Sequence, residues 1–219
     1  MITNKELNEA VSKFDVLERR GSFYDMAVGL INNGFEIEAY CLILATWNFA
    51  AFRYAVKDFD LVGFRQTIEK LNSRFSTMEV EDFRIIDFDK YRDDIVAIFE
   101  TLCHIRGIQY TGASKVMHLR NRSVFVMWDG YISGDKPKKY YDALDIVKRR
   151  CWRPKRYQKN GEGYFQFLKD TQDLFKNMNI KNHRRTFTKA IDEYNYVNIT
   201  LLIQDMEREA QKKRRKSKN

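Results

Sequence analysis

Hydrophobic residues recur at helical intervals along most of the chain. Residues 3–19 carry an apolar side chain every three or four positions, which predicts an amphipathic helix. Thr3 and Glu6 have the spacing of a capping box at its start. Ser22 is expected to cap a second helix that ends at Gly34.

The most apolar segment, residues 35–57, predicts one long helix at the centre of the fold. Its unbroken apolar part, from Ala39 to Ala51, is too short to cross a membrane. Asp60 then has the position of a cap for a helix that extends to Ser73.

Residues 74–88 alternate loosely between apolar and polar positions, which is compatible with a short strand pair or an extended linker. We favour a linker between two lobes. Asp89 is expected to cap the helix that follows. The remaining helices are predicted at residues 90–104, 111–119, 140–149, 163–177 and within 184–210, with loops at 133–139 and 152–161.

The pattern therefore predicts an all-α protein with two helical lobes around a cleft. Residues 1–211 are expected to form one globular unit. One lobe comes mainly from residues 90–150, and the other comes from the N-terminal and C-terminal helices. The tail at residues 212–219, KKRRKSKN, contains nothing to bury and is predicted to be disordered. It either keeps the protein in solution or adds electrostatic contact to phosphates.

Charge and cysteine content narrow the choice of partners. The 219 residues include 39 Lys+Arg and 30 Asp+Glu, a formal charge of +9, which favours a polyanion, nucleic acid first and an anionic membrane second. The three cysteines, Cys41, Cys103 and Cys151, form no C-x-x-C pair, so a zinc ribbon or a four-cysteine iron–sulfur cluster is excluded. An odd number without a signal peptide predicts an intracellular location, in the cytoplasm and nucleoid or in the nucleus.

Residues 102–119, LCHIRGIQYTGASKVMHL, match the helix-hairpin-helix pattern h-x-x-h-x-G-h-G-x-x-x-A-x-x-h-h, except that Gln109 replaces its second glycine. Gly107 permits a tight turn, and Ala113 is expected to be small because the two helices cross there. Such a turn presents main-chain N–H groups at a helix N-terminus to a DNA phosphate. It positions the duplex without reading its sequence.

Downstream lies SVFVMWDGYI, residues 123–132, with Asp129 in an apolar context. Together, residues 102–132 resemble the helix-hairpin-helix DNA glycosylase superfamily, which includes the endonuclease III-like enzymes, the mismatch adenine glycosylases and the oxoguanine glycosylases. Counting back from Ala113 places Thr111 where bifunctional members carry a catalytic lysine. Thr111 precedes Asp129 by the 18 residues that are typical of the family.

The resemblance implies a monofunctional enzyme without an iron–sulfur cluster. Threonine cannot form a Schiff base, so water would be the nucleophile. Asp129 would stabilise the positive charge that develops on the deoxyribose and orient the water. The alternative is that Asp129 only caps the following helix. Lys115 lies one helical turn beyond Thr111 and is a candidate for a displaced Schiff-base lysine, a phosphate contact or a surface residue.

The remaining site assignments are weaker. A base pocket is expected from Trp47, Asn48, Phe49 and Trp128, with ordinary core aromatics as the alternative. His104 and His118 are expected to be structural. Contacts to double-stranded DNA are expected from Gly107, Gln109, Gly112, Lys115, Arg120, Arg122, Arg153, Lys155 and Arg156.

For the basic stretch that contains Arg153, Lys155 and Arg156, the alternative is a solvated basic loop without a DNA contact. A monovalent cation at the hairpin is the one cofactor weighed, and neither a membrane nor an obligate protein partner is expected. Two further functions stay open beside the glycosylase. One is a non-catalytic helix-hairpin-helix DNA-binding protein, and the other, less favoured, is an enzyme acting on RNA or free nucleosides.

Overall fold

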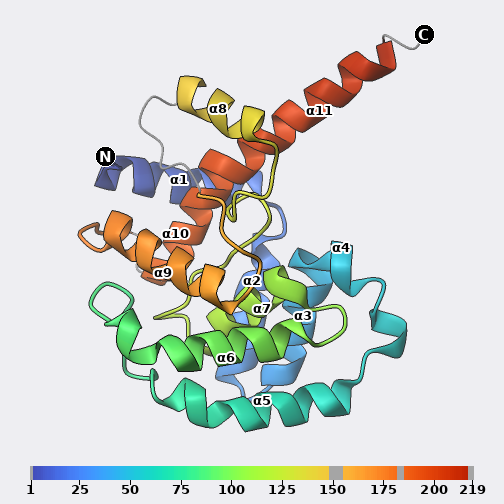
Figure 1. The fold of residues 1–219 in the computed structure, drawn as a ribbon, viewed down its shortest axis with the longest axis vertical. Coiled ribbons are helices and arrows are strands. Elements are labelled where there is room, and N and C mark those ends of the chain that lie inside the picture. The colour runs from blue at the N-terminus through green and yellow to red at the C-terminus, as the bar shows by residue number, and fades with distance from the viewer. Residues whose placement is uncertain (1, 148–154, 182–184, 217–219) are drawn as a thin grey trace.

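A computed structural model describes residues 2–147, 155–181 and 185–216, and these residues form an all-helical protein with no strand (Figure 1). The α-helices are α1 (Asn4–Leu17), α2 (Gly21–Asn32), α3 (Glu36–Trp47), α4 (Phe49–Phe52), α5 (Leu61–Ser76), α6 (Arg92–Cys103), α7 (Gln109–Arg120), α8 (Lys138–Val147), α9 (Gly161–Phe175), α10 (Phe187–Asn195) and α11 (Leu201–Lys216). Single turns of 3₁₀-helix occupy Val56–Asp58 and Phe88–Tyr91, and a π-helical segment occupies Tyr196–Thr200. The predicted fold class is confirmed at this level.

Helix α6 is at the centre of one part of the structure, where α5, α7 and α9 pack against it. Helix α7 also contacts α3 and α2. In a second region, α1 packs against α10 and the π-helical segment, which leads into α11. The apolar side chains of both regions belong to one continuous core.

The first helix confirms its predicted start, because Thr3 and Glu6 form both hydrogen bonds of the capping box. The second helix does not begin as expected. It starts at Gly21, and no side-chain cap is present, so the prediction that Ser22 is the cap is wrong.

The predicted single helix over residues 35–57 is also wrong, because the helix ends at Trp47. Asn48 leaves the helical conformation, with φ −120° and ψ 22°. Its side-chain amide donates hydrogen bonds to the carbonyl oxygens of Gly107 and Ile108, at 3.1 and 2.9 Å. The helix therefore ends where Asn48 forms hydrogen bonds to a distant part of the chain. Apolar periodicity could not predict these hydrogen bonds.

The segment at residues 74–88 contains no strand, and it is not a solvated linker. Met78, Phe83 and Ile86 are buried, and the side chain of Gln172 donates hydrogen bonds to the carbonyl oxygens of Phe83 and Ile86. The predicted cap is also displaced by two residues, since Asp87 rather than Asp89 caps the short turn before α6.

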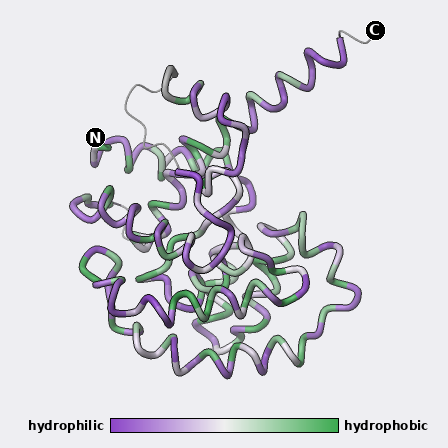
Figure 2. Tube along the Cα trace, viewed as in Figure 1, coloured by the Kyte–Doolittle hydropathy of each residue, from purple (hydrophilic) through white to green (hydrophobic). Residues whose placement is uncertain are grey.

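The basic tail differs most from expectation. Helix α11 continues through Lys216, so residues 212–216 are helical rather than disordered. Backbone hydrogen bonding needs no burial, and a last turn of lysine and arginine suits the negative end of the helix dipole. The end of α11 projects from the body as a hydrophilic rod (Figure 2). In the part of the chain that is described, no helix is long and apolar enough to cross a membrane.

Candidate functional site

The predicted turn between two helices is present between α6 and α7. Gly107 has φ +88° and Gln109 has φ +53°, so both occupy the left-handed region. A Cβ at Gly107 would lie 2.5 Å from the Cβ of Ala55, so glycine is required there for space as well as for conformation. Gln109 accepts the same backbone conformation at a cost of about 1 kcal/mol. The first N–H groups of an α-helix such as α7 have no intrahelical acceptor.

The turn packs against the C-terminal end of α3. The two hydrogen bonds from Asn48 fix the carbonyl groups of residues 107 and 108. A Cβ at Gly112 would lie within 3 Å of atoms of Asn48, Ile108 and Leu44, so glycine allows α7 to approach α3 closely. Gly112 is buried and its amide donates to the carbonyl oxygen of Ile108. The expectation that Gly112 contacts DNA is therefore wrong.

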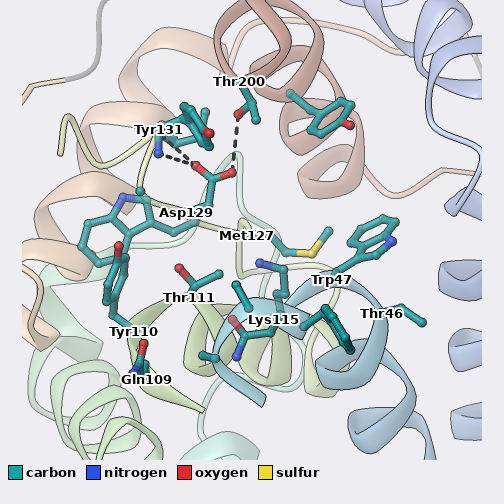
Figure 3. A pocket seen from close by; sticks show the side chains of 18 of the residues that line it. Thr46, Trp47, Gln109, Tyr110, Thr111, Lys115, Met127, Asp129, Tyr131 and Thr200 are labelled. Carbon is teal, nitrogen blue, oxygen red and sulfur yellow. Dashed lines mark hydrogen bonds between the residues drawn. The ribbon is translucent and has the colours of Figure 1, made fainter. Parts of the chain in front are cut away.

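A cavity of about 880 Å³ lies beside this turn. Thr111 and Lys115 from α7, Asp129 from the following loop and Trp47 from α3 all line it. Figure 3 shows Thr111 and Lys115 extending from α7 towards Asp129. Three candidates separated by up to 18 positions in the sequence thus share one cavity. Gly107, Gln109, Asn48, Phe49 and Trp128 also contribute to its wall.

Asp129 both caps the local turn and faces the cavity. Its Oδ1 accepts hydrogen bonds from the amides of Tyr131 and Ile132, at 2.7 and 2.9 Å. The hydroxyl of Thr200 donates to Oδ2 at 3.4 Å. Burial raises the pKa of Asp129, although the charge of Lys115 and the two amides act in the opposite direction. The two roles predicted as alternatives are therefore compatible in one side chain.

Lys115 is a buried amine within the same cavity. It is only 6% exposed, which excludes the surface-residue alternative and the expected phosphate contact in this conformation. Among the described residues, no hydrogen bond or ion pair is recorded for its ammonium group. Burial lowers its pKa, while the charges of Asp129 and Asp192 partly offset this effect. A buried lysine with a lowered pKa has a larger neutral, nucleophilic fraction.

The four expected pocket residues differ in role. The ring of Trp47 stacks on Tyr24 with centroids 5.8 Å apart. Phe49 is 54% exposed at the rim. The side-chain amide of Asn48 is hydrogen-bonded to the hairpin turn. Trp128 is 1% exposed and packs among the aromatic rings of α6 and α9, so the core alternative holds for its ring.

Several basic residues expected to contact DNA lie away from the turn. Arg120 and Arg122 are at the far end of α7, about 16 Å along the helix axis. Arg120 lies over the ring of Phe75, and Arg122 reaches Asn32. Helix α7 therefore separates these two arginines from the hairpin turn, and their contact with DNA stays a prediction.

The predicted basic loop is only partly within the described residues. Lys155 pairs with Asp170 at 2.9 Å and Arg156 is exposed. Arg153 and Cys151 lie outside the described residues. Cys41 and Cys103 are half-buried, and burial raises the pKa of both thiols.

The two histidines have the structural roles that were expected. His118 is fully buried between the hydroxyl of Tyr24 and the carbonyl oxygen of Phe125. Burial lowers its pKa to about 4, so it is neutral near pH 7. His104 bonds the carbonyl oxygen of Glu100. In the described residues, no group of His, Cys, Asp and Glu has an arrangement suited to a metal ion.

Sequence reasoning missed one polar cluster in the cavity wall. Arg20 donates from Nε and Nη2 to the two oxygens of Glu18, at 2.8 and 2.7 Å. The Tyr196 hydroxyl donates to the same carboxylate at 2.6 Å. Arg20 is half-exposed and fixed in orientation, and Arg106 lines the same cavity from the hairpin turn. Glu18 and Arg20 are only two residues apart, and hydrophobic periodicity gives no indication that their side chains form a cluster with Tyr196.

The Glu18 cluster predicts a specific loss of stability in acid. Burial opposes ionisation of Glu18, but hydrogen bonds from Arg20 and Tyr196 outweigh it and lower the pKa to about 2. A lowered carboxyl pKa stabilises the fold above its ordinary value near 4.5, and this stabilisation is lost as the pH falls towards 2. We expect Glu18→Gln to cost about 2–3 kcal/mol at pH 7.

Urea unfolding at pH 7 and pH 3 measures this effect. The difference between wild type and Glu18→Gln is expected to shrink by about 2 kcal/mol at pH 3. Glu162→Gln, which removes an exposed pair with Arg92, serves as the control and should change stability by less than about 1 kcal/mol at either pH. A Glu18→Gln difference that is independent of pH would contradict the assigned pKa.

Comparison of the chain with protein-family models, with curated proteins and with solved structures gives no match.

Proposed function

We propose that this protein is a DNA glycosylase of base-excision repair that hydrolyses the N-glycosidic bond of a damaged or mismatched base in double-stranded DNA. The observation that carries the proposal is the shared cavity of Asp129, Thr111 and Lys115 beside a tight turn of main-chain amides. Its volume of about 880 Å³ is within the range of small-molecule sites. This is enough space for an extruded base and its sugar.

The mechanism assigns a role to each part of the site. The α6–α7 turn, as a helix-hairpin-helix motif, binds a phosphate through N–H groups at the start of α7. The target nucleotide leaves the stack and enters the cavity between the two lobes. Water attacks C1′ and the C–N bond breaks. The base leaves with the bonding electrons and takes up a proton from solvent, which balances the proton that the water loses. Asp129 stabilises the developing positive charge and accepts the proton of the water.

Cations at the cavity rim support a polyanionic ligand. Arg20 and Arg106 reach the rim from the α1–α2 connection and from the hairpin turn. Both guanidinium groups are more than half-exposed, and each is paired with a carboxylate, Arg20 with Glu18 at 2.7 Å and Arg106 with Asp58 at 3.8 Å. Duplex binding should therefore weaken steeply with salt as counterions are released.

Lys115 supports a second route on the same site. Its buried amine and lowered pKa are suited to attack on the aldehyde of an abasic site, which gives an imine and releases water. Borohydride supplies a hydride that reduces this imine to a stable protein–DNA adduct. An adduct formed by wild type and by Lys169→Gln, but not by Lys115→Gln, supports the amine route. Base release by wild type without any adduct supports water as the only nucleophile.

The proposed function is tested on a panel of duplexes that carry uracil, oxoguanine, alkylated bases and mismatches. Release of a base is detected as an abasic site that alkali cleaves. We expect release from at least one duplex in the panel. Salt-sensitive duplex binding without any release would favour the non-catalytic DNA-binding alternative, and salt-insensitive association would contradict both.

A further inference from the structure

A second buried ammonium group lies behind the cavity wall. Lys189 on α10 is 1% exposed. Its Nζ lies 4.3, 4.8 and 4.6 Å from the ring centres of Phe14, Tyr24 and Trp47. Burial of a charge is unfavourable unless it is paired. Cation–π contacts with three rings offset part of this cost.

The pairing comes from carboxylates one turn further along α10. Lys189 Nζ lies 2.7 Å from Asp192 Oδ2 and 3.5 Å from Glu193 Oε1. Breaking a buried ion pair by removing one partner is strongly destabilising. The caged ammonium therefore holds the Asp192 side chain in a fixed position.

Asp192 is also part of the cavity wall. It lines the cavity together with Trp47, Lys115 and Asp129, and its side chain keeps 19% exposure. Its Oδ2 accepts a hydrogen bond from Lys189 at 2.7 Å, whereas Oδ1 accepts none from another described residue. An ionised carboxylate accepts hydrogen bonds and cannot donate them. A ligand that meets Oδ1 must therefore bring an N–H or O–H donor.

We propose that Asp192 determines which base the cavity accepts, and that the accepted base presents an exocyclic amino group to it. This inference rests on the proposed glycosylase function. Trp47 lines the cavity together with Asp192, and its ring is held by stacking on Tyr24 and by the Lys189 ammonium. A base whose corresponding edge carries a carbonyl oxygen would bring two acceptors together and leave both without a donor.

Pairs of bases in which the exocyclic amino group is replaced by a carbonyl oxygen, with a proton gained on the adjacent ring nitrogen, test the proposal. Duplexes carry adenine or hypoxanthine, cytosine or uracil, and oxoguanine or oxidised xanthine in the same sequence context. We expect wild type to release the amino-bearing member at least about tenfold faster within a pair, because unpaired polar groups in a built site are strongly discriminated against. Asp192→Asn, whose amide donates as well as accepts, is expected to reduce this ratio to within about threefold.

A ratio measured within one variant cancels any loss of folded protein. Asp173→Asn, at an exposed residue on α9, is the control and should keep the wild-type ratio. Preferential release of the carbonyl-bearing members, or an unchanged ratio in Asp192→Asn, would overturn the role of Asp192 and leave the glycosylase proposal intact.

A binding experiment measures the preference for amino-bearing bases in the absence of hydrolysis. A 2′-fluorine on the target nucleotide destabilises positive charge on the sugar and prevents hydrolysis, so affinity can be measured for the same pairs of bases. Tighter binding of the amino-bearing duplex, lost in Asp192→Asn, supports the assignment even if no duplex is hydrolysed, in which case only the catalytic proposal fails. Equal affinities for the two members of every pair would overturn the assignment.

Discussion

Asp129→Asn is expected to reduce the rate of base release by about 10²–10³-fold, because the charge that stabilises the sugar cation is removed. Asparagine keeps a side-chain oxygen that accepts from the amides of Tyr131 and Ile132, so the local turn should persist. Single-turnover release at saturating protein measures the chemical step. Duplex affinity, measured by fluorescence anisotropy, should change little.

The salt dependence of binding separates a catalytic defect from a binding defect. Asp129 contacts no phosphate in the proposed complex, so the slope of affinity against salt should equal that of wild type. Asp173→Asn controls for the loss of one negative charge at a distance from the cavity. Release by Asp129→Asn within about threefold of wild type would remove Asp129 from the mechanism.

The hairpin shows how much local sequence can predict. Glycine at 107, the apolar pattern of residues 102–117 and the position of Asp129 were sufficient to predict a compact turn and the neighbouring candidate residues. The left-handed backbone at Gln109 shows that the substituted position keeps the conformation expected of glycine. These features depend on backbone sterics over a few residues, which is why one sequence reveals them.

Long-range polar contacts explain most of the errors. The end of α3 coincides with an amide at residue 48 bonded to carbonyl groups about sixty residues away. The buried path of residues 74–88 depends on Gln172, which lies far away in the sequence. Periodicity reports which face of a helix is apolar but not which distant backbone group a side chain will bond.

Charged residues in the cavity illustrate the same limit. Lys115 was a candidate only through its spacing from Thr111, and nothing in the sequence singled out Asp192 or Lys189, since buried lysine and aspartate are rare. The three aromatic rings around Lys189 come from three different helices, Phe14 from α1, Tyr24 from α2 and Trp47 from α3. The hydrophilic end of α11 shows the reverse error, because a segment with nothing to bury still continues a helix that begins in the core.

Trp128→Ala is expected to cause the largest loss of stability, about 3–5 kcal/mol. The indole is 1% exposed and stacks on Phe167, with centroids 5.8 Å apart. It also contacts the rings of Phe99 and Tyr164, which stack on each other. Truncation to alanine leaves a cavity that rigid helices cannot fill. Urea unfolding of each variant at pH 7 gives the change in the free energy of unfolding.

Trp128→Phe separates ring packing from the polar group. The indole Nε1 is buried and has no hydrogen-bond partner among the described residues, so phenylalanine removes an unsatisfied donor while keeping most of the aromatic contact. Trp128→Phe should lower the free energy of unfolding by about 1–2 kcal/mol. Phe49→Ala, at the exposed rim, should change it by no more than about 0.5 kcal/mol. Because residue 128 precedes Asp129 and its amide and carbonyl both bond the Ser114 hydroxyl, the same packing holds the carboxylate at the cavity. A loss below 1 kcal/mol in Trp128→Ala would show that this aromatic cluster does not anchor the site.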